Sequence, residues 1–352
     1  MARLKVGIAG YGIVGKRRHQ CLEKHPRFET IAVCDRRFEQ DSILDGGVRA
    51  YTNYTALLRE PLDVLLVCMS NDMAAEVTIG GLRRGLHVFC EKPPSRTLGE
   101  LHDVLAVERQ NPGLRLMYGF NHRYHGSVQD ALSIIRSGEL GRIINLRGLY
   151  GKSKLITFNQ PDWRAKRELA GGGVLLDQGI HIVDLMRLFA GEFDHVHSVV
   201  SNSHWGYDVE DNAYALMTTP DGVVGLVNSS ATQWRHQFSL DINLERGSLL
   251  LRGILTSSKS YGSETLTIVR ADPDHDNGDP SETTRTYNID PSWDGEIDAF
   301  ATAIDSGIAP DHGTSRDAFL TMSLVNRIYF ADPRWRARYS IPNPDDFTLP
   351  HD

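Results

Sequence analysis

The chain has 352 residues, a length that predicts two domains, and its 41% hydrophobic and 24% charged residues are typical of a globular protein with a sizeable core. Its net charge of −7 includes no basic patch of the kind that nucleic acid or an anionic membrane needs, and no apolar run approaches the ~20 residues of a membrane span. The N-terminal stretch MARLKVGIAG passes directly into a strand pattern, so no secretory signal is expected, and the four cysteines (Cys21, Cys34, Cys68 and Cys90) contain no CxxC pair. These features predict a cytoplasmic protein with reduced cysteines.

Strand and helix patterns alternate along the first third of the chain. The strand-like runs are LKVGIAG, ETIAVCD, DVLLVCM, HVFCEKP and RLMYGFN, and helical segments are expected at 13–24, 74–84 and 98–110. DVLLVCM is almost entirely hydrophobic, as in a parallel sheet that is covered on both faces. The alternation predicts an α/β Rossmann domain, a doubly wound parallel sheet, over residues 1–121.

The pattern changes after residue 122. Helices are expected at 126–137 and in a glycine-led segment at 171–186, and strand patterns joined by short turns dominate from 195 to 290. They predict an α+β domain over 122–352 with a large, mostly antiparallel open sheet. One face of that sheet is available for self-association, so we expect a homodimer or homotetramer. Two last helices, 294–307 and 314–331, are expected to pack back on the first domain.

The acidic stretch at 272–282, DPDHDNGDPSE, has the alternating aspartates of a calcium loop. Its glycine, however, falls one place late, and the twelfth position is Thr283 instead of a glutamate. We therefore expect a solvated surface loop.

A GxGxxG motif lies between the first strand and the first helix and comprises Gly10, Tyr11, Gly12, Ile13, Val14 and Gly15. In a dinucleotide-binding fold the first glycine permits the tight turn, the second lets a pyrophosphate approach the backbone, and the third allows helix and strand to pack closely. Asp35 follows the second strand, where an acid binds the ribose hydroxyls, and it favours NAD because a carboxylate repels a 2′-phosphate. Arg36 and Arg37 follow at once and could accommodate that phosphate, so NADP stays open. A glycine turn without a ligand is the alternative.

Two further segments carry groups that suit catalysis. Glu91-Lys92-Pro93-Pro94 ends a predicted parallel strand, at the sheet edge where ligands bind, and Lys92 there could hydrogen-bond a substrate oxygen. Its alternative is a surface lysine before a proline turn. In GGGVLLDQGIHIVDLM (171–186), Asp177 and His181 are four residues apart and share one face of a helix, and the glycines leave N–H groups free to meet a ligand.

The second segment also permits two other interpretations. Asp177, His181 and Asp184 could bind a metal, although a fourth ligand with clear spacing is missing, so no metal is expected. His181 could also be a hydrogen-bonded core histidine.

The motifs GIAGYGIVG, CEKP and GGGVLLDQGIH, in this order, resemble the glucose–fructose oxidoreductase/inositol dehydrogenase/MocA (Gfo/Idh/MocA) family. The resemblance runs nearly the whole chain and includes GFNHRYHGSVQDALSIIRSGELGRI and DGEIDAFATAIDSG. It implies a catalytic group of Lys92, Asp177 and His181. It also implies NAD(P)-dependent hydride transfer between nicotinamide and a secondary alcohol or ketone of a sugar, a sugar derivative (including a nucleotide-activated one) or a cyclitol.

The resulting expectation for alcohol oxidation assigns a role to each group. His181 takes the hydroxyl proton, Lys92 stabilises the developing oxyanion, and Asp177 orients the substrate hydroxyl or the imidazole. Whether Lys92 or His181 accepts the proton stays open. Two other functions also stay open: a hydrolase or epimerase that uses NAD transiently, and a non-catalytic NAD-binding regulator.

The expected ligand contacts extend beyond the catalytic group. Cofactor contacts are expected from Gly10, Gly12, Ile13, Val14, Gly15, Asp35, Arg36, Ser70, Asn71, Glu91 and Lys92. Substrate contacts are expected from Lys92, Asn121, Arg123, Trp163, Arg164, Asp177 and His181. Packing is the alternative for the tryptophan and a solvated ion pair for the arginines. The family commonly has a proline and a histidine where this chain has Ser70 and Ala74, which leaves the wall of the nicotinamide pocket open.

Overall fold

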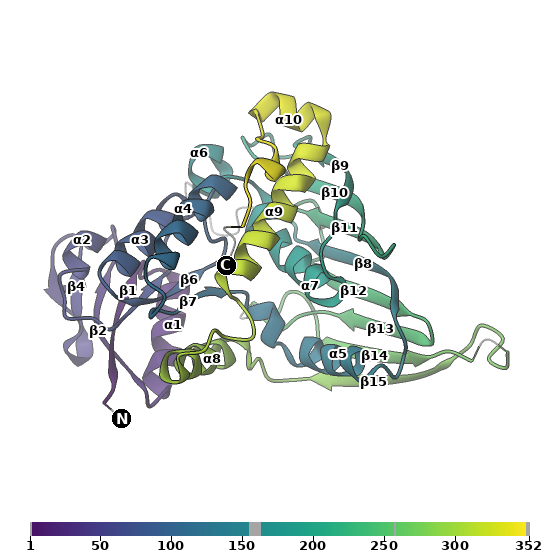
Figure 1. The fold of residues 1–352 in the computed structure, drawn as a ribbon, viewed down its shortest axis with the longest axis horizontal. Coiled ribbons are helices and arrows are strands. Elements are labelled where there is room, and N and C mark those ends of the chain that lie inside the picture. Colours follow the sequence, from purple (N-terminus) through teal and green to yellow (C-terminus); the bar gives the residue numbers. More distant parts are fainter. Residues whose placement is uncertain (1, 155–162, 257, 273, 350–352) are drawn as a thin grey trace.

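The computed structural model describes residues 2–154, 163–256, 258–272 and 274–349. Two β-sheets stand side by side, with helices on their faces and between them (Figure 1). No helix within these ranges is both long enough and apolar enough to cross a membrane.

The N-terminal sheet has seven strands in the order β3-β4-β2-β1-β5-β6-β7. The strands are β1 (Leu4–Ala9), β2 (Phe28–Cys34), β3 (Ser42–Ile43), β4 (Arg49–Tyr51), β5 (Val64–Val67), β6 (His87–Glu91) and β7 (Leu116–Gly119). All neighbouring strands are parallel except β3 and β4. The predicted parallel α/β sheet is therefore confirmed, and β6 ends immediately before Lys92.

Helices cover both faces of this sheet. The helices concerned are α1 (Ile13–Lys24), α2 (Tyr54–Leu57), α3 (Asn71–Arg83), α4 (Leu98–Arg109) and α8 (Ser292–Ser306). On one face, α8 inserts Phe300 among core side chains, with its ring 6.4 Å from that of Phe28 and 5.7 Å from that of Phe89. A helix from the end of the chain thus completes the core of the first sheet.

The second sheet has eight strands in the order β15-β14-β13-β12-β8-β11-β10-β9. They are β8 (Ile143–Gly151), β9 (His195–Ser201), β10 (Asn212–Thr218), β11 (Val224–Ser230), β12 (Gln237–Leu244), β13 (Gly247–Arg252), β14 (Glu264–Arg270) and β15 (Ser281–Tyr287). All pairs are antiparallel except β8 with β11, which confirms the mostly antiparallel sheet. The expected loop at 272–282 is shorter than predicted because β15 begins at Ser281. That strand, SETTRTY, is polar throughout and gives no hydrophobic alternation to detect.

The remaining helices lie mainly between the two sheets or at their ends (Figure 1). They are α5 (Gly126–Ser137), α6 (Arg167–Ala170), α7 (Ile180–Ala190), α9 (Ser315–Ala331) and α10 (Pro333–Tyr339). α7 packs on β8 and β11, and α9 packs on α4, α7 and β9. Only one face of the second sheet is covered by these helices.

The glycine-led segment differs from the regular α-helix that the sequence predicts. Leu175–Gly179 forms a π-helical turn, and the α-helix α7 begins only at Ile180. Gly179 lies against β11 so closely that an added Cβ would be 2.6 Å from Ser229 Oγ. A wide turn with a glycine at this contact lets the segment reach the sheet, and such π-turns are frequent at functional sites.

Candidate active site

The GxGxxG loop has the geometry that its glycines predict. Gly10 has a φ of 92°, and an added Cβ would lie 2.3 Å from the backbone oxygen of Cys68. A Cβ on Gly15 would lie 2.0 Å from the oxygen of Gly10, so helix and strand pack as closely as the motif requires. A Cβ on Gly12 would meet only Arg37 Nη2 within 4 Å, at 3.6 Å. The backbone at Gly12 is therefore open to a ligand, and a pyrophosphate fits there at the start of α1.

Asp35 joins this loop to Arg37. Its Oδ2 accepts from the Tyr11 N–H at 2.9 Å and from Arg37 Nη2 at 2.9 Å, and its Oδ1 accepts from Arg37 Nε at 2.8 Å. Burial raises the pKa of Asp35, but the bonds from Arg37 and Tyr11 outweigh it and hold the pKa below its usual range. Arg36 is exposed beside this pair. A ribose that binds here meets a carboxylate already shared with a guanidinium.

Two other predicted cofactor residues have protein partners. The buried Asn71 side chain donates from Nδ2 to the Ala170 oxygen at 2.8 Å, and Glu91 accepts from Arg18 Nε at 2.6 Å. Ser70 occupies the N-cap position of α3 and makes no side-chain capping bond. Contacts of these three residues with a cofactor stay a prediction.

Lys92 and Asp177 meet where the two halves of the chain face each other. Lys92 Nζ donates to the backbone oxygen of Asp177 at 2.7 Å. The Asp177 carboxylate lies 3.1 Å from Lys152 Nζ and 3.3 Å from Arg164 Nε. The guanidinium of Arg164 also lies over the ring of Trp163, 4.5 Å from its centroid. Asp177 thus gathers three cations around one carboxylate and one carbonyl.

This charge cluster shifts the pKa of both catalytic candidates. Burial lowers the pKa of Lys92, although Asp177 and Glu91 counteract it. Burial raises the pKa of Asp177, but Lys152, Arg164 and Lys92 together hold it well below its usual range. A charged Asp177 beside a lysine that releases its proton more readily than usual is suited to proton-coupled chemistry.

His181, at the start of α7, is 5% exposed, and its ring stacks face to face on that of His122. Burial lowers the pKa of His181 well below its usual range, and the Lys92 cation lowers it further. A neutral imidazole close to the Lys92 ammonium can accept a proton from a substrate hydroxyl.

Lys152 and His122 had no motif that could identify them. Lys152 is 4% exposed and directly follows β8. His122 is 4% exposed. Only their burial, which the sequence does not give, distinguishes them from surface residues.

Arg123, a predicted substrate residue, forms ion pairs within the protein. Its guanidinium is 3% exposed and binds Asp184 through Nε and Nη2, both at 2.7 Å, while Nη1 lies 3.1 Å from Asp317. Thr321 Oγ1 also donates to Asp184, at 2.9 Å. Arg123 therefore ties its loop to α7 and α9, and a contact of Arg123 with substrate stays a prediction.

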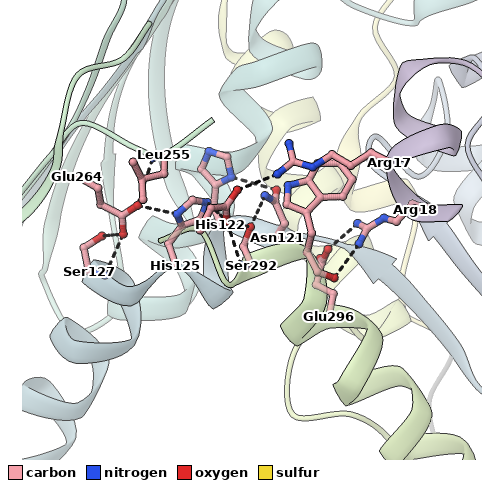
Figure 2. Close-up of polar contacts among 12 residues, drawn as sticks. Arg17, Arg18, Asn121, His122, His125, Ser127, Leu255, Glu264, Ser292 and Glu296 are labelled. Carbon is pink, nitrogen blue, oxygen red and sulfur yellow. Dashed lines mark hydrogen bonds and ion pairs between the residues drawn. The ribbon is translucent and has the colours of Figure 1, made fainter. Parts of the chain in front are cut away.

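Asn121 is likewise engaged within the protein. Its Nδ2 donates to Ser292 Oγ at 3.1 Å, and its Oδ1 lies 3.2 Å from His122 Nδ1 (Figure 2). The side chain is 9% exposed. These contacts hold Asn121 beside His122, and a contact of Asn121 with substrate stays a prediction.

The N–H groups at the start of the glycine-led segment are also occupied, contrary to expectation. The Glu210 carboxylate accepts from Gly173 N at 2.7 Å and from Leu175 N at 2.9 Å. Burial raises the pKa of Glu210. These N–H groups therefore hold a carboxylate of the chain itself and not a ligand.

Among the described residues, no group of three or more His, Cys, Asp or Glu side chains is arranged to hold a metal ion. Asp184 is paired with Arg123, and the Asp177 carboxylate is surrounded by cations. The alternative of a metal bound by Asp177, His181 and Asp184 is therefore not supported.

Comparison with known families agrees with this architecture. The model described as "Oxidoreductase family, NAD-binding Rossmann fold" matches residues 4–120, and the GFO/IDH/MocA C-terminal domain model matches residues 128–250. The two matches span well over half of the chain. The chain belongs to the Gfo/Idh/MocA family of oxidoreductases.

Its relatives include enzymes that are named as dehydrogenases of sugars. Levoglucosan dehydrogenase of Pseudarthrobacter phenanthrenivorans is 29% identical over 221 residues, which are 57% of this chain but only 55% of the relative. D-glucoside 3-dehydrogenase of Escherichia coli (strain K12) is 30% identical over 267 residues, 68% of this chain and 74% of the relative. A solved levoglucosan dehydrogenase, in complex with NADH and levoglucosan, shares the fold with a TM-score of 0.81 at 20% identity, over 95% of this chain and 98% of that one.

Proposed function

We propose that this protein is an NAD(P)-dependent dehydrogenase or reductase that acts on a secondary alcohol or ketone of a sugar, a sugar derivative or a cyclitol. One observation carries the proposal: the 2.7 Å bond from Lys92 Nζ to the Asp177 oxygen. It brings the end of β6 to the segment that holds Asp177 and His181. Ligands of open parallel sheets bind at this same carboxyl edge, close to the glycine loop.

The proposed chemistry divides among the chain's own groups. A bound nicotinamide supplies a hydride acceptor or donor. His181 accepts the hydroxyl proton at a ring nitrogen during oxidation, and Lys92 Nζ hydrogen-bonds the substrate oxygen as its charge develops. Lys152 and Arg164, the two cations that bind the Asp177 carboxylate, offer hydrogen-bond donors to further hydroxyls of a polyol. The polyhydroxylated substrates in the names of the relatives agree with such a donor-rich site.

We assign cofactor binding to residues 1–121 and substrate contacts and self-association to residues 122–352, with 294–331 packed back on the first domain. The packing of Phe300 against β2 and β6 supports this division. Both NAD and NADP are compatible with the site because Arg37 shares the Asp35 carboxylate.

The test is a panel of sugars and cyclitols with NAD and NADP, followed by nicotinamide absorbance. Reduction of the cofactor by at least one of these alcohols supports the proposal. The Lys92→Met and His181→Ala variants should lose turnover by about 100-fold or more while dinucleotide affinity changes little. Conversion of a glycoside or sugar without net change in absorbance would instead indicate a hydrolase or epimerase, and binding of dinucleotide without any conversion would indicate a regulator.

We further propose that the uncovered face of the second sheet joins two copies of the chain. Exposed apolar side chains occupy adjacent positions of β9, β10 and β11; they are Val199, Tyr214, Leu216, Val224 and Leu226. Beside them on the same face, Arg147 lies 3.0 Å from Asp241, which also contacts Arg252. An apolar patch next to charges of both signs is complementary to itself across a two-fold axis. Leu226→Arg should yield a monomer in light scattering, whereas Ile308→Arg, an exposed residue outside the sheet, should keep the assembly.

The cysteines support a reducing compartment, which we take to be the cytoplasm. All four are free thiols. Burial raises the pKa of Cys34 and of Cys90 to about 12, so neither thiol ionises near neutral pH.

A further inference from the structure

Two histidines from distant parts of the chain form a stacked pair beside the catalytic lysine. The rings of His122 and His181 are 3.8 Å apart between centroids and inclined by only 11°. His122 comes from the short helix Asn121–Tyr124 that follows β7, and His181 comes from α7. Both side chains are buried.

Within the described part of the chain, no hydrogen-bonded group orients the ring of His181. Its Nδ1 is buried and has no partner among the described residues. The Asp177 carboxylate, which could have served this purpose, is bound to Lys152 and Arg164 instead. A catalytic imidazole generally needs an orienting partner to present the correct nitrogen. In this site the flat contact with His122 takes the place of that partner.

His122 is itself fixed by a chain of hydrogen bonds (Figure 2). The Asp290 carboxylate can only accept, so Ser292 donates its hydroxyl to Asp290 Oδ1 at 2.6 Å and accepts from Asn121 Nδ2 at 3.1 Å. Asn121 therefore turns its carbonyl oxygen to His122, 3.2 Å from Nδ1. This polarity assigns the ring hydrogen of His122 to Nδ1 and leaves Nε2 to accept.

The other ring nitrogen of His122 also has a partner. Nε2 lies 3.3 Å from the Tyr150 hydroxyl, which can donate to it. At the end away from His122, this series of hydrogen bonds is anchored by Arg17 of α1, whose Nη2 lies 2.9 Å from Asp290 Oδ2. His122 is thus a neutral ring with both nitrogens engaged and one flat face turned to His181.

The stacked arrangement also limits what His122 can do. The N–H bonds of an imidazole lie in the plane of its ring, so two rings stacked face to face cannot pass a proton directly between them. His122 cannot be the next proton acceptor after His181. It can act only by holding the other ring and by keeping water away from one of its faces.

We propose that His122 is a positioning residue for His181, whose ring it holds in one orientation and shields from water so that this imidazole stays neutral. The proposal rests on the proposed function insofar as His181 is the base. It predicts that removal of His122 damages catalysis through His181 and leaves dinucleotide binding intact.

The charged and titratable groups that face the pair determine the expected direction of its pH dependence. Lys92 faces His181 from the end of β6, and the Tyr150 ring lies 6.3 Å from it on β8. His125 is close to both rings and is paired with Glu264 at 2.8 Å. If His122 is removed, water enters the site and the desolvation that keeps His181 neutral is reduced. The pKa of His181 then rises toward its ordinary value.

The experiment compares two variants of His122 and one control variant with the wild-type protein, and a further His122 variant is held in reserve. His122→Ala removes the stack, and His122→Phe keeps a flat ring without nitrogens. His122→Leu replaces the alanine variant if that variant does not fold, since it fills space without a flat face. His275→Ala, at an exposed loop histidine, is the control for loss of an imidazole. The readouts are histidine ¹⁵N NMR without substrate, dinucleotide affinity, and the pH dependence of kcat and kcat/KM.

The stack predicts a graded result. His122→Ala should lower kcat by about tenfold or more, with smaller changes in KM, and should move the acid limb of kcat/KM upward by about one pH unit. Its His181 signals should show protonation at higher pH or exchange between orientations. His122→Phe should keep most of kcat and the wild-type acid limb. Dinucleotide affinity should be unchanged throughout.

Two results would overturn the proposal. The first is a His122→Ala enzyme with the kcat, acid limb and His181 signals of the wild type. The second is a His122→Phe enzyme as impaired as His122→Ala with undisturbed His181 signals, because the nitrogens of His122 would then take part in the chemistry. If the wild type oxidises no polyol, the proposed function fails, but the NMR comparison still decides whether His122 orients His181.

Discussion

Replacement of Asp184 by alanine should destabilise the protein severely and affect catalysis only as a consequence. The substitution removes two charge-assisted hydrogen bonds of 2.7 Å to Arg123 and one of 2.9 Å from Thr321. It leaves Arg123, which is 3% exposed, with Asp317 as its remaining partner at 3.1 Å. Breaking a buried ion pair by deleting one side costs about 3–5 kcal/mol. Because Asp317 still compensates part of the charge, we expect about 3 kcal/mol.

Urea unfolding followed by circular dichroism measures this loss. Glu139→Ala is the control, because it breaks the ion pair of Glu139 with Arg270, whose side chains are 49% and 46% exposed. An exposed pair is worth about 1 kcal/mol or less. The double variant Arg123→Met/Asp184→Leu removes both charges and should be more stable than Asp184→Ala, since no charge is left buried without its partner.

The opposite outcome would support the substrate contact that the sequence predicts for Arg123. If Asp184→Ala unfolds within about 1 kcal/mol of the wild type and its main defect is a raised KM for the sugar, Arg123 is free to contact substrate. The assignment of Arg123 to a buried ion pair that stabilises the fold would then be wrong.

Three further predictions follow from other parts of the structure. Arg37→Ala should weaken NADP binding by about tenfold, which corresponds to the loss of one charge-assisted hydrogen bond at a partly exposed site. Calorimetric titrations should show little effect on NAD binding. Equal losses of affinity for both cofactors would contradict a role of Arg37 in binding the 2′-phosphate. Burial keeps His122 and His181 neutral in the folded state. In the unfolded chain both histidines bind protons below pH ~6.5. As the pH falls below that value, each histidine should therefore lower the free energy of unfolding by about 1.4 kcal/mol per pH unit. Urea unfolding midpoints measured across this pH range test the prediction. In His122→Phe the free energy of unfolding should fall less steeply with decreasing pH, and a slope identical to that of the wild type would contradict the prediction. Gly173→Ala places a Cβ 2.1 Å from the Glu210 oxygen and should lower the thermal midpoint by several degrees, unlike Gly113→Ala, where nothing lies within 4 Å; similar midpoints for the two variants would contradict the close contact.

Much of the fold could be predicted because its signals are local. The helix predicted at 126–137 coincides with α5, and the parallel sheet follows from hydrophobic runs between helical segments. β15 lies within the 195–290 region where strands are expected, but its mostly polar sequence gives no alternation that would fix its bounds. The π-helical turn was missed because its cause is a contact between Gly179 and Ser229, which are far apart in sequence.

The candidate site divides in the same way. Lys92, Asp177 and His181 belong to short motifs, which made them candidates from the sequence, and their catalytic roles stay predictions. The buried ion pair of Arg123 could not be predicted because its partner Asp184 lies 61 residues away, and a sequence does not show which arginines have buried partners. His122 was overlooked for the same reason, since its importance depends on a ring contributed by another helix.

Glu210 makes the N-terminal end of the glycine-led segment a site for an internal carboxylate. The N-terminal end of a helical segment normally attracts anions, and here that position is filled by a carboxylate that also accepts from the Tyr329 hydroxyl at 2.6 Å. A phosphate on the substrate near Gly173 would have to displace a buried internal anion held by three donors. This end of the segment is therefore an internal anion site, whose N–H groups become free for a ligand only if the Glu210 carboxylate leaves them.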